Sequence, residues 1–344
     1  MSGMTAVRWH GRQDVRVDRI PPAPTPGPGQ VRVAVAWCGI CGTDLHEYRA
    51  GPFLIPLTPH PTTGCRAPIV LGHEISGHVE SVGDGVDEVG VGDLVVLNAL
   101  LPCGTCRPCR RGALHLCTRL GHLGFSADGG LAELLSVPHD MVVPVPAGVP
   151  SDVAALAEPF AVAIHAVGIA GDPVGTDCVV LGAATIGLCV ASVLRARGNS
   201  VTVHDVAGPR REHAAALGFA TGDPADAPMV PLVFECSGAL AALRRAVSIV
   251  EAGGTVVLIG IPESDVPIDI TDVVIREVRL LGTMSHLRDR DLRPTAEHVA
   301  AHADEAAQLI TARIELADTV TRGLQVLDGP DRSRHAKILV RVGG

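Results

Sequence analysis

The sequence predicts an α/β protein with two domains, a β-rich first part and a doubly wound parallel sheet covered by helices. Two observations predict this class. Up to about residue 150, short apolar runs recur between glycine, proline and aspartate residues, which is typical of short strands and turns. After Pro150, strand and helix patterns alternate, which is typical of a parallel sheet covered by helices. The length of 344 residues suits about two domains.

The first part reads as a series of strands after a proline-rich segment. Proline removes backbone donors and fixes φ, so residues 21–29 cannot form a helix or a central strand. Strand patterns follow at residues 31–36, 77–82, 93–97, 134–137 and 141–145.

The second part begins with a predicted helix over residues 153–169, interrupted near Pro159. Strands and helices then alternate, and the tail adds one helix and one strand. The predicted strands are residues 178–181, 201–204, 230–235, 255–259 and 337–342. The predicted helices are residues 186–197, 209–217, 240–250 and 295–310.

The charge and aromatic content exclude nucleic-acid binding. Acidic residues outnumber basic ones by 37 to 28, the formal net charge is −9, and no basic tract is present. Aromatic residues make up only 2% of the chain, too few for stacking on single-stranded nucleic acid. Lys337 is the only lysine, which we attribute to coding bias in a GC-rich genome rather than to chemistry.

The apolar and cysteine patterns indicate a cytoplasmic protein without a membrane partner. No secretory signal is visible, and the longest uncharged apolar run, Cys178 to Leu194, is marginal for a membrane span. Gly182 and Gly187 interrupt that run, so a buried strand–turn–helix explains it better. Ten cysteines in such a chain indicate metal ligation rather than a disulfide scaffold.

The strongest motif is a loop of four cysteines, Cys103, Cys106, Cys109 and Cys117. Four thiolates on one short loop can close a tetrahedral shell around Zn²⁺, and a filled shell indicates a structural site. One alternative is a coincidence of buried cysteines, which rarely come at this density. The other is an iron–sulfur cluster, which four thiolates also hold.

A second set of candidate metal ligands is dispersed along the chain: Cys41, His73 with its neighbour Glu74, and Glu158. Each of these residues alone is a weak signal, since a lone histidine is usually a surface or core residue. Cys38 and Cys41 have the spacing of a redox dithiol, but no thioredoxin-like βαβ pattern begins there.

A glycine-containing turn follows the predicted strand at 178–181 and opens a helix. It nearly matches the dinucleotide fingerprint G-x-G-x-x-G, with an acidic residue at the end of the next strand. In that reading the first glycine permits the tight turn, the last permits close helix–strand packing, and the helix N-terminus faces the pyrophosphate. The middle glycine is replaced by alanine, and such turns also occur without any ligand. The residues concerned are Gly182, Ala184, Ile186, Gly187 and Asp205.

Taken together, these motifs resemble the zinc-dependent medium-chain dehydrogenase/reductase family of the alcohol dehydrogenase type, over essentially the whole chain. Within that family the chain looks most like the 2,3-butanediol and polyol dehydrogenases. The residues that carry the resemblance are Cys38-Gly39-Ile40-Cys41-Gly42-Thr43-Asp44-Leu45-His46, Gly72-His73-Glu74 with Gly77, the four-cysteine loop, Gly129-Gly130 with Ala132-Glu133, the nucleotide turn, and Glu158-Pro159.

The resemblance implies a GroES-like catalytic domain at residues 1–155, a Rossmann NAD-binding domain at 156–290, and a C-terminal return to the first domain at 291–344. It also implies two zinc ions per chain. Cys41, His73 and Glu158 would bind the catalytic zinc, with Glu74 near or on the metal, and the four cysteines would bind the structural zinc. Departures from the family are Ala184, the short stretch at 218–231 where the third strand should lie, and Ser285-His286.

The implied activity is hydride transfer between a secondary alcohol, a vicinal diol or polyol such as 2,3-butanediol, and NAD (EC 1.1.1.-). By resemblance, the Thr43 hydroxyl contacts the substrate oxygen and relays its proton towards His46. Glu47 and Tyr48 are candidates for contacting a second substrate hydroxyl, while Tyr48 packing in the cleft wall is the plainer reading.

The cofactor and the partners follow from the same resemblance. Asp205 would accept hydrogen bonds from the adenosine ribose and repel a 2′-phosphate, which favours NAD, while nearby Arg210 complicates that preference. We expect a small alcohol or ketone substrate and a homodimer or homotetramer. Two other functions stay open: a biosynthetic dehydrogenase of one specialised metabolite, and a redox-silent zinc protein, for which Ala184 is the only support.

Overall fold

A computed structural model describes residues 3–343 and divides into two compact units. The first unit contains the described residues up to Glu158, then Leu287–Arg332, and the chain from Lys337 onward. The second unit contains Pro159–His286 and Ser333–Ala336. Each unit has its own sheets, so the β-rich and the parallel-sheet parts predicted from the sequence are both present.

The first unit is built around a mixed seven-stranded sheet in the order β10-β6-β5-β3-β18-β17, with β9 also paired to β3. Two smaller sheets accompany it, in the orders β2-β1-β4 and β7-β8. The strands are β1 (Met4–Gly11), β2 (Asp14–Ile20), β3 (Gln30–Gly39), β4 (Ile69–Val70), β5 (Glu74–Val82), β6 (Leu94–Leu97), β7 (Leu100–Leu101), β8 (Gly121–His122), β9 (Leu134–Pro138), β10 (Val142–Pro144), β17 (Ile310–Glu315) and β18 (Lys337–Arg341).

Short helices join these strands, and apolar residues that alternate along the strands form the core. In β3, for example, Val31, Val33 and Val35 are buried on one side while the residues between them are more exposed, which is the period-2 pattern of a half-buried strand. The helices of this unit are α1 (Gly42–Ala50), α2 (Arg107–Arg110), α3 (Ser151–Ala154), α9 (Arg293–Ala301), α10 (Ala303–Ala307) and α11 (Gln325–Asp328).

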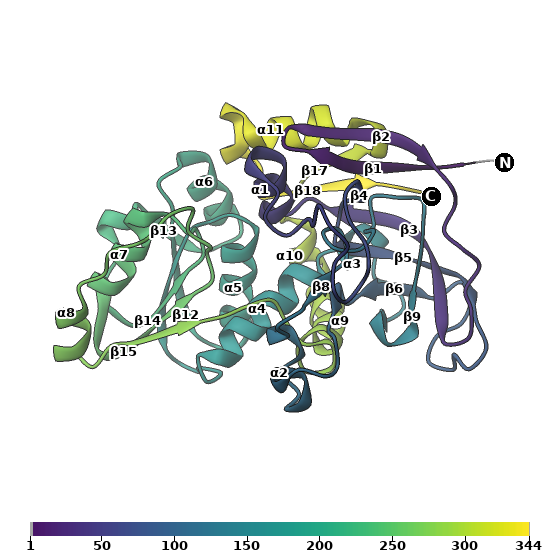
Figure 1. Cartoon of the computed structure of the whole chain (residues 1–344). Helices are drawn as coiled ribbons and strands as arrows, with labels where there is room; N and C mark the ends of the chain where they lie inside the picture. The colour runs from purple at the N-terminus through teal and green to yellow at the C-terminus, as the bar shows by residue number, and fades with distance from the viewer. Residues whose placement is uncertain (1–2, 344) are drawn as a thin grey trace. The chain divides into compact units, whose positions relative to one another are not determined.

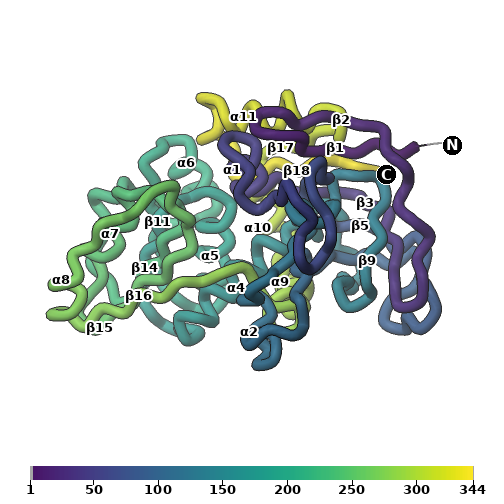
Figure 2. The backbone as a smooth tube through the Cα atoms, in the orientation of Figure 1, coloured from purple at the N-terminus to yellow at the C-terminus, as the bar shows by residue number. Residues whose placement is uncertain are grey.

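The C-terminal strand returns to the first unit, as the resemblance implied. β18 pairs antiparallel with β3, with Val340 opposite Cys38, and Figure 2 shows the yellow end of the chain running beside the purple β3. Residues from both ends of the sequence therefore lie next to each other in one sheet.

The second unit is a six-stranded parallel sheet in the order β13-β12-β11-β14-β15-β16 (Figure 1). This is the strand order of the Rossmann fold. From β11 to β13 the strands are added towards one edge of the sheet, and from β14 to β16 they are added towards the other edge. Rossmann folds bind dinucleotides at this switch point beside the first strand. The strands are β11 (Asp177–Leu181), β12 (Ser200–His204), β13 (Ala220–Gly222), β14 (Val230–Glu235), β15 (Val250–Leu258) and β16 (Arg279–Gly282). The helices are α5 (Thr185–Ala196), α6 (Gly208–Ala216), α7 (Leu240–Ile249) and α8 (Ile270–Ile275), while α4 (Ala157–Ile169) begins at the boundary of the two units.

Most predicted elements occur within a few residues of their predicted bounds, and three regions need comment. The helix predicted over 153–169 is interrupted near Pro159 as expected: α3 ends at Ala154, and Pro159 lies in the first turn of α4, where its missing N–H costs nothing. The expected helix over 295–310 ends at Ala307, and Ile310 already begins β17. The third strand does exist in the short stretch at 218–231, as the edge strand β13.

Among the described residues, one stretch, Ser151–Ile169, is long and apolar enough by length and composition to cross a membrane. In the structure 72% of that stretch is buried, as in the core helices of globular proteins.

Candidate functional site

Three potential metal ligands meet in the first unit: the ligand atoms of Cys41, His73 and Glu74 all lie within 4.8 Å of one another. Cys41 caps the N-terminus of α1 directly after β3, and His73 and Glu74 stand where β5 begins. Because β3 and β5 pair antiparallel with Gly39 opposite Glu74, the end of one strand meets the start of the other. Strand pairing thus assembles ligands that are distant in the sequence.

Asp44 contacts two of these ligands. Its Oδ2 accepts a hydrogen bond from the backbone N–H of Cys41 at 2.9 Å, the N3-to-N-cap contact of a capping box. Its Oδ1 lies 3.7 Å from Nδ1 of His73, and neither of these two buried atoms has a hydrogen-bond partner. Since metal-bound histidines commonly direct their second ring nitrogen to a carboxylate, this pair leaves Nε2 of His73 for a metal.

Glu158 lies in the first turn of α4 and is 7% exposed, beside the same cluster. The pKa of Glu158 is raised to about 8, and burial is the largest cause of this shift. The charges of Glu74 and Cys41 also raise this pKa, whereas the charge of His73 lowers it. Glu158 is not in the group of side chains whose ligand atoms meet within 4.8 Å. The structure therefore brings together the predicted residues Cys41, His73 and Glu74, with Glu158 adjacent.

The donor set fits a divalent cation. Burial raises the pKa of the Cys41 thiol to about 12, and the nearby Glu74 carboxylate contributes to this shift. Burial also raises the pKa of Asp44. Ionising a buried acid costs free energy unless an opposite charge lies nearby. A cation that binds the thiolate and the carboxylate supplies that opposite charge. A thiolate, an imidazole and a carboxylate are ligands that zinc accepts.

Sequence reasoning missed the partner of Glu74. Nζ of Lys337 donates to both carboxylate oxygens of Glu74, at 2.7 and 2.6 Å, and both side chains are buried. The sequence does single out this residue, because Lys337 is the only lysine in the chain. Its pairing with Glu74 shows that this lysine has a chemical role and is not explained by coding bias alone.

Two predicted relay residues, Thr43 and His46, lie on α1, one turn apart and on the same face of the helix. Oγ1 of Thr43 is 3.7 Å from Sγ of Cys41, so the hydroxyl stands at the edge of the metal cluster. Both side chains are partly exposed.

The suggestion that Glu47 contacts a substrate hydroxyl is wrong in this structure. Its fully buried carboxylate accepts hydrogen bonds from the backbone N–H groups of Phe53 and Leu54. Glu47 therefore fixes the turn that follows α1. Tyr48 is 7% exposed and belongs to the apolar core, in agreement with the plainer reading.

The four-cysteine loop forms a compact cluster of sulfur atoms. Sγ of Cys106 lies 3.3 Å from Sγ of Cys109 and 3.8 Å from Sγ of Cys117. Four sulfurs at tetrahedral corners around zinc, with Zn–S about 2.3 Å, are about 3.8 Å apart. Backbone N–H donation from Thr105 lowers the pKa of the Cys103 thiol to about 5, which favours the metal-binding thiolate.

In the second unit the nucleotide turn has the geometry that its glycines require. Gly182 has a φ of +103°, in the region that favours glycine, and a Cβ at Gly187 would lie 1.7 Å from the carbonyl oxygen of Gly182. Ala184 caps α5 with a φ of −84°, which alanine adopts without strain, and Ile186 lies in the first turn. The argument from Ala184 for a redox-silent protein therefore has no backbone strain behind it.

Asp205 follows β12 and is tied to this turn. Its Oδ2 accepts from the backbone N–H of Ala183 at 2.8 Å and its Oδ1 from that of Ala207 at 2.8 Å. Nη1 of Arg210 lies 3.6 Å from Oδ2. The predicted cofactor residues Gly182, Gly187, Asp205 and Arg210 are thus grouped at the C-terminal ends of β11 and β12.

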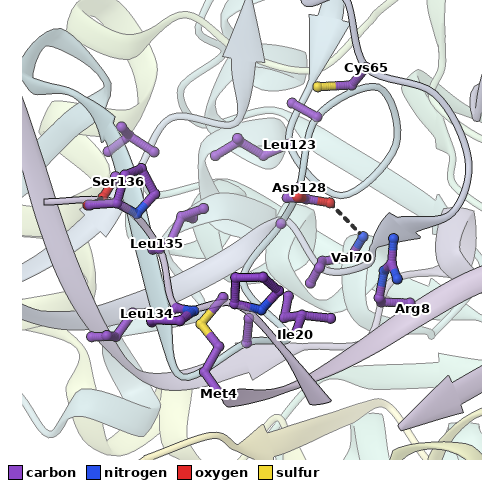
Figure 3. Close-up of a pocket in the computed structure, with 18 of the residues that line it drawn as sticks. Met4, Arg8, Ile20, Cys65, Val70, Leu123, Asp128, Leu134, Leu135 and Ser136 are labelled. Carbon is purple, nitrogen blue, oxygen red and sulfur yellow. Dashed lines mark hydrogen bonds between the residues drawn. The ribbon is translucent and has the colours of Figure 1, made fainter. Parts of the chain in front are cut away.

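An apolar cavity of about 530 Å³ lies elsewhere in the first unit, between the proline-rich segment and β9 (Figure 3). Its polar side chains serve the protein itself. Asp128 accepts from the backbone N–H of Val70 at 2.9 Å, and the Ser136 hydroxyl donates to the carbonyl oxygen of Pro24 at 2.6 Å. The cavity shares no residue with the metal cluster, so it is not the candidate site.

Comparison with known proteins agrees with this geometry. The family described as alcohol dehydrogenase GroES-like domain matches residues 27–147, and the family described as zinc-binding dehydrogenase matches residues 185–301. The (R,R)-butanediol dehydrogenase of Bacillus subtilis is 34% identical over 98% of this chain and 99% of its own. The chain belongs to the zinc-dependent alcohol dehydrogenase family.

Solved structures of this family have the same fold as the chain. The 2R,3R-butanediol dehydrogenase from Bacillus subtilis gives a TM-score of 0.89 at 34% identity, covering 98% of this chain and 99% of that one. A putative zinc-binding dehydrogenase from Sinorhizobium meliloti, bound to NADP, gives 0.88 at 30% identity, covering 99% and 100%. The predicted GroES-like and Rossmann parts are confirmed, and so is a zinc-dependent oxidoreductase that uses a nicotinamide cofactor.

The sulfur cluster predicts a separable zinc site. In the variant Cys106→Ser one thiolate of four is lost, so the zinc content should fall by one ion per chain, and the Tm should fall with it. Atomic absorption and thermal unfolding measure both. The control Cys65→Ser, a cysteine outside the loop, should keep the wild-type zinc content. Full zinc content in Cys106→Ser would show that the loop does not hold the metal.

The nucleotide turn predicts a sharp steric effect at Gly187. Gly187→Ala places a methyl group against the Gly182 carbonyl, and such overpacking typically costs about 1–3 kcal/mol. We expect NADH affinity, measured by fluorescence titration, to fall at least tenfold. Gly168→Ala is the matched control, because its Cβ would meet only Asp172 Oδ1 at 3.8 Å. Equal NADH affinities in both variants would contradict the assignment of the turn.

Proposed function

We propose that the protein is an NAD-dependent, zinc-containing dehydrogenase of secondary alcohols, and that vicinal diols or polyols of the 2,3-butanediol type are its substrates. One structural observation carries this proposal: Cys41, His73 and Glu74 converge with Glu158 beside them, next to the Thr43 hydroxyl. The names of the butanediol dehydrogenase relatives support the diol as substrate class.

Cys41, His73 and Glu158 would hold the catalytic zinc, and the four cysteines of the loop would hold a second, structural zinc. A metal with three protein ligands has an open position, where it acts as a Lewis acid on a substrate oxygen and favours hydride transfer to the nicotinamide. The Asp44 carboxylate faces Nδ1 of His73 at 3.7 Å, where it would pair with that nitrogen once Nε2 binds the metal.

Thr43 and His46 would move the alcohol proton. Thr43, at the edge of the cluster, takes a hydrogen bond from the substrate hydroxyl and passes the proton on through its own hydroxyl. His46 lies one turn further along α1 and is partly exposed, so its imidazole can exchange the proton with solvent. This gives the proton a route out of a buried site.

The preference for NAD rests on Asp205. Its carboxylate stands at the end of β12, where the fold places the acid that binds the adenosine ribose, and its charge disfavours a 2′-phosphate. Arg210 lies 3.6 Å away and reduces that charge. The relative bound to NADP shows that the family also accepts the other cofactor. A cytoplasmic homodimer or homotetramer completes the proposal.

A substrate panel read by NADH absorbance at 340 nm tests the function. We expect oxidation of 2,3-butanediol and polyols with NAD, at least tenfold better in kcat/KM than with NADP, and two zinc ions per chain in the same sample. Activity confined to one complex metabolite would support the biosynthetic alternative. Absence of NADH formation with every diol, polyol and hydroxy-amino acid would contradict the proposal.

The relay predicts a specific defect at Thr43. Thr43→Val removes the hydroxyl but keeps the branched shape, so kcat/KM for diol oxidation should fall by about 10²–10⁴, the usual contribution of a positioned proton-transfer group. Thr43→Ser keeps the hydroxyl and should retain most activity. Zinc content and NADH affinity, measured on both variants, should match the wild type. Wild-type turnover in Thr43→Val would rule out the relay.

A further inference from the structure

Lys337 is a charged residue at the metal cluster with no role in the chemistry described above. It opens β18 and is 2% exposed. Its ammonium group donates to both oxygens of Glu74 and, at 3.0 Å, to the carbonyl oxygen of Ile40. A lysine ammonium group carries three N–H donors, so it can serve all three of these acceptors at once. The lysine is therefore a built partner of Glu74.

Glu74 reaches this lysine through a space that a glycine leaves. A Cβ at Gly39 would lie 1.8 Å from Oε2 of Glu74, and the two residues face each other in the β3–β5 pairing. Any side chain at position 39 would push the carboxylate out of this place. The sequence thus provides both a cation and room for Glu74 beside it.

The backbone of Lys337 is held on two sides. Its carbonyl oxygen accepts from the Thr311 hydroxyl at 2.9 Å, and the next residue, Ile338, accepts from the backbone N–H of Ile40 at 3.1 Å. The sheet therefore fixes the backbone from which the Lys337 side chain reaches Glu74 and Ile40.

Two carboxylates, those of Glu74 and Glu158, are candidates for the same metal site. Glu74 is within ligand range of Cys41 and His73, and Glu158 is adjacent. If both carboxylates bound zinc together with the thiolate and the imidazole, four protein ligands would close the tetrahedral shell, as in a structural site. A catalytic site needs an open position, so one carboxylate must be held away from the metal.

We propose that Lys337 is a positioning residue that holds Glu74 away from the metal, so that Cys41, His73 and Glu158 bind it and one position stays open. The inference rests on the metal site of the proposed function. The charges agree with it, because Lys337 cancels Glu74, while the thiolate of Cys41 and the carboxylate of Glu158 balance the two charges of Zn²⁺.

The open position can be measured without turnover. Protein loaded with Co²⁺ in place of zinc absorbs visible light, and imidazole that binds the open position changes that spectrum. The four-cysteine site has no open position, so the imidazole difference spectrum reports only on the cluster of Cys41. The apparent Kd for imidazole is the readout.

In Lys337→Met the Glu74 carboxylate loses its cation and should turn to the metal, so imidazole affinity should fall at least tenfold. Lys337→Arg keeps a cation and should stay within about threefold of the wild type. The double variant Lys337→Met/Glu74→Gln removes the competing carboxylate and should regain wild-type affinity. A purely structural role for the lysine would give no such rescue.

A second route avoids the burial of an altered lysine. Gly39→Ala displaces Glu74 while leaving Lys337 intact, and it should weaken imidazole binding as Lys337→Met does. Gly11→Ala is the matched control, since no atom lies within 4 Å of its Cβ. If Lys337→Met does not fold, two comparisons still test the role of Lys337. One compares Gly39→Ala with Gly11→Ala, and the other compares Glu74→Gln with the double variant.

Wild-type imidazole affinity in Lys337→Met or Gly39→Ala would overturn the role of Lys337, as would a double variant that stays as weak as Lys337→Met. In the fallback comparison, a tenfold loss between Glu74→Gln and the double variant would also overturn it. Failure of the wild type to give any imidazole spectrum would instead contradict the metal site of the proposed function, so the two failures are distinguishable.

Discussion

The burial of several acidic side chains around one lysine is the constraint on which the site depends. Cys41, Asp44, Glu74 and Glu158 are gathered where strands β3 and β5 meet, and Lys337 is the lysine that faces them. Removing one partner of a buried ion pair typically costs about 3–5 kcal/mol, because the other charge stays buried. Lys337 therefore compensates the buried charge of Glu74, and a bound metal cation would compensate the remaining donors.

Close backbone packing gives this charge cluster its precision. Gly72, just before His73, has a φ of +94°, and a Cβ there would lie 2.5 Å from Sγ of Cys38. A Cβ at Gly129 would lie 2.1 Å from the carbonyl oxygen of Gly72. Because both residues are glycines, the two backbones pack directly against each other at this crossing, next to His73. The Gly129-Gly130 pair that helped to indicate the family is explained by this crossing.

The parts predicted well from sequence are those that short-range spacing encodes. The four cysteines lie on one loop, and the turn from Gly182 to Gly187 lies between one strand and one helix, so their geometry follows from local chemistry. The parts missed depend on long-range pairing. Glu47 was expected at the substrate but turns into the chain that follows α1. The contact of Lys337 with Glu74 cannot be inferred from local sequence, because it depends on the pairing of β18 with β3. Ile310 was expected in a helix because apolar spacing alone does not separate the last helical turn from a following strand.

The place of Lys337 in the chain gives its role a further physical basis. The chain passes from the second unit to the first between Ala336 and Lys337. In the second unit the carbonyl oxygen of Ala336 accepts a hydrogen bond from the hydroxyl of Thr185, the first residue of α5 after the nucleotide turn. In the first unit the next residue holds Glu74. One peptide bond therefore joins a partner of the nucleotide helix to a partner of the metal site. Because Lys337 begins β18, which pairs with β3, the cation beside Glu74 is positioned by the pairing of strands from the two ends of the chain.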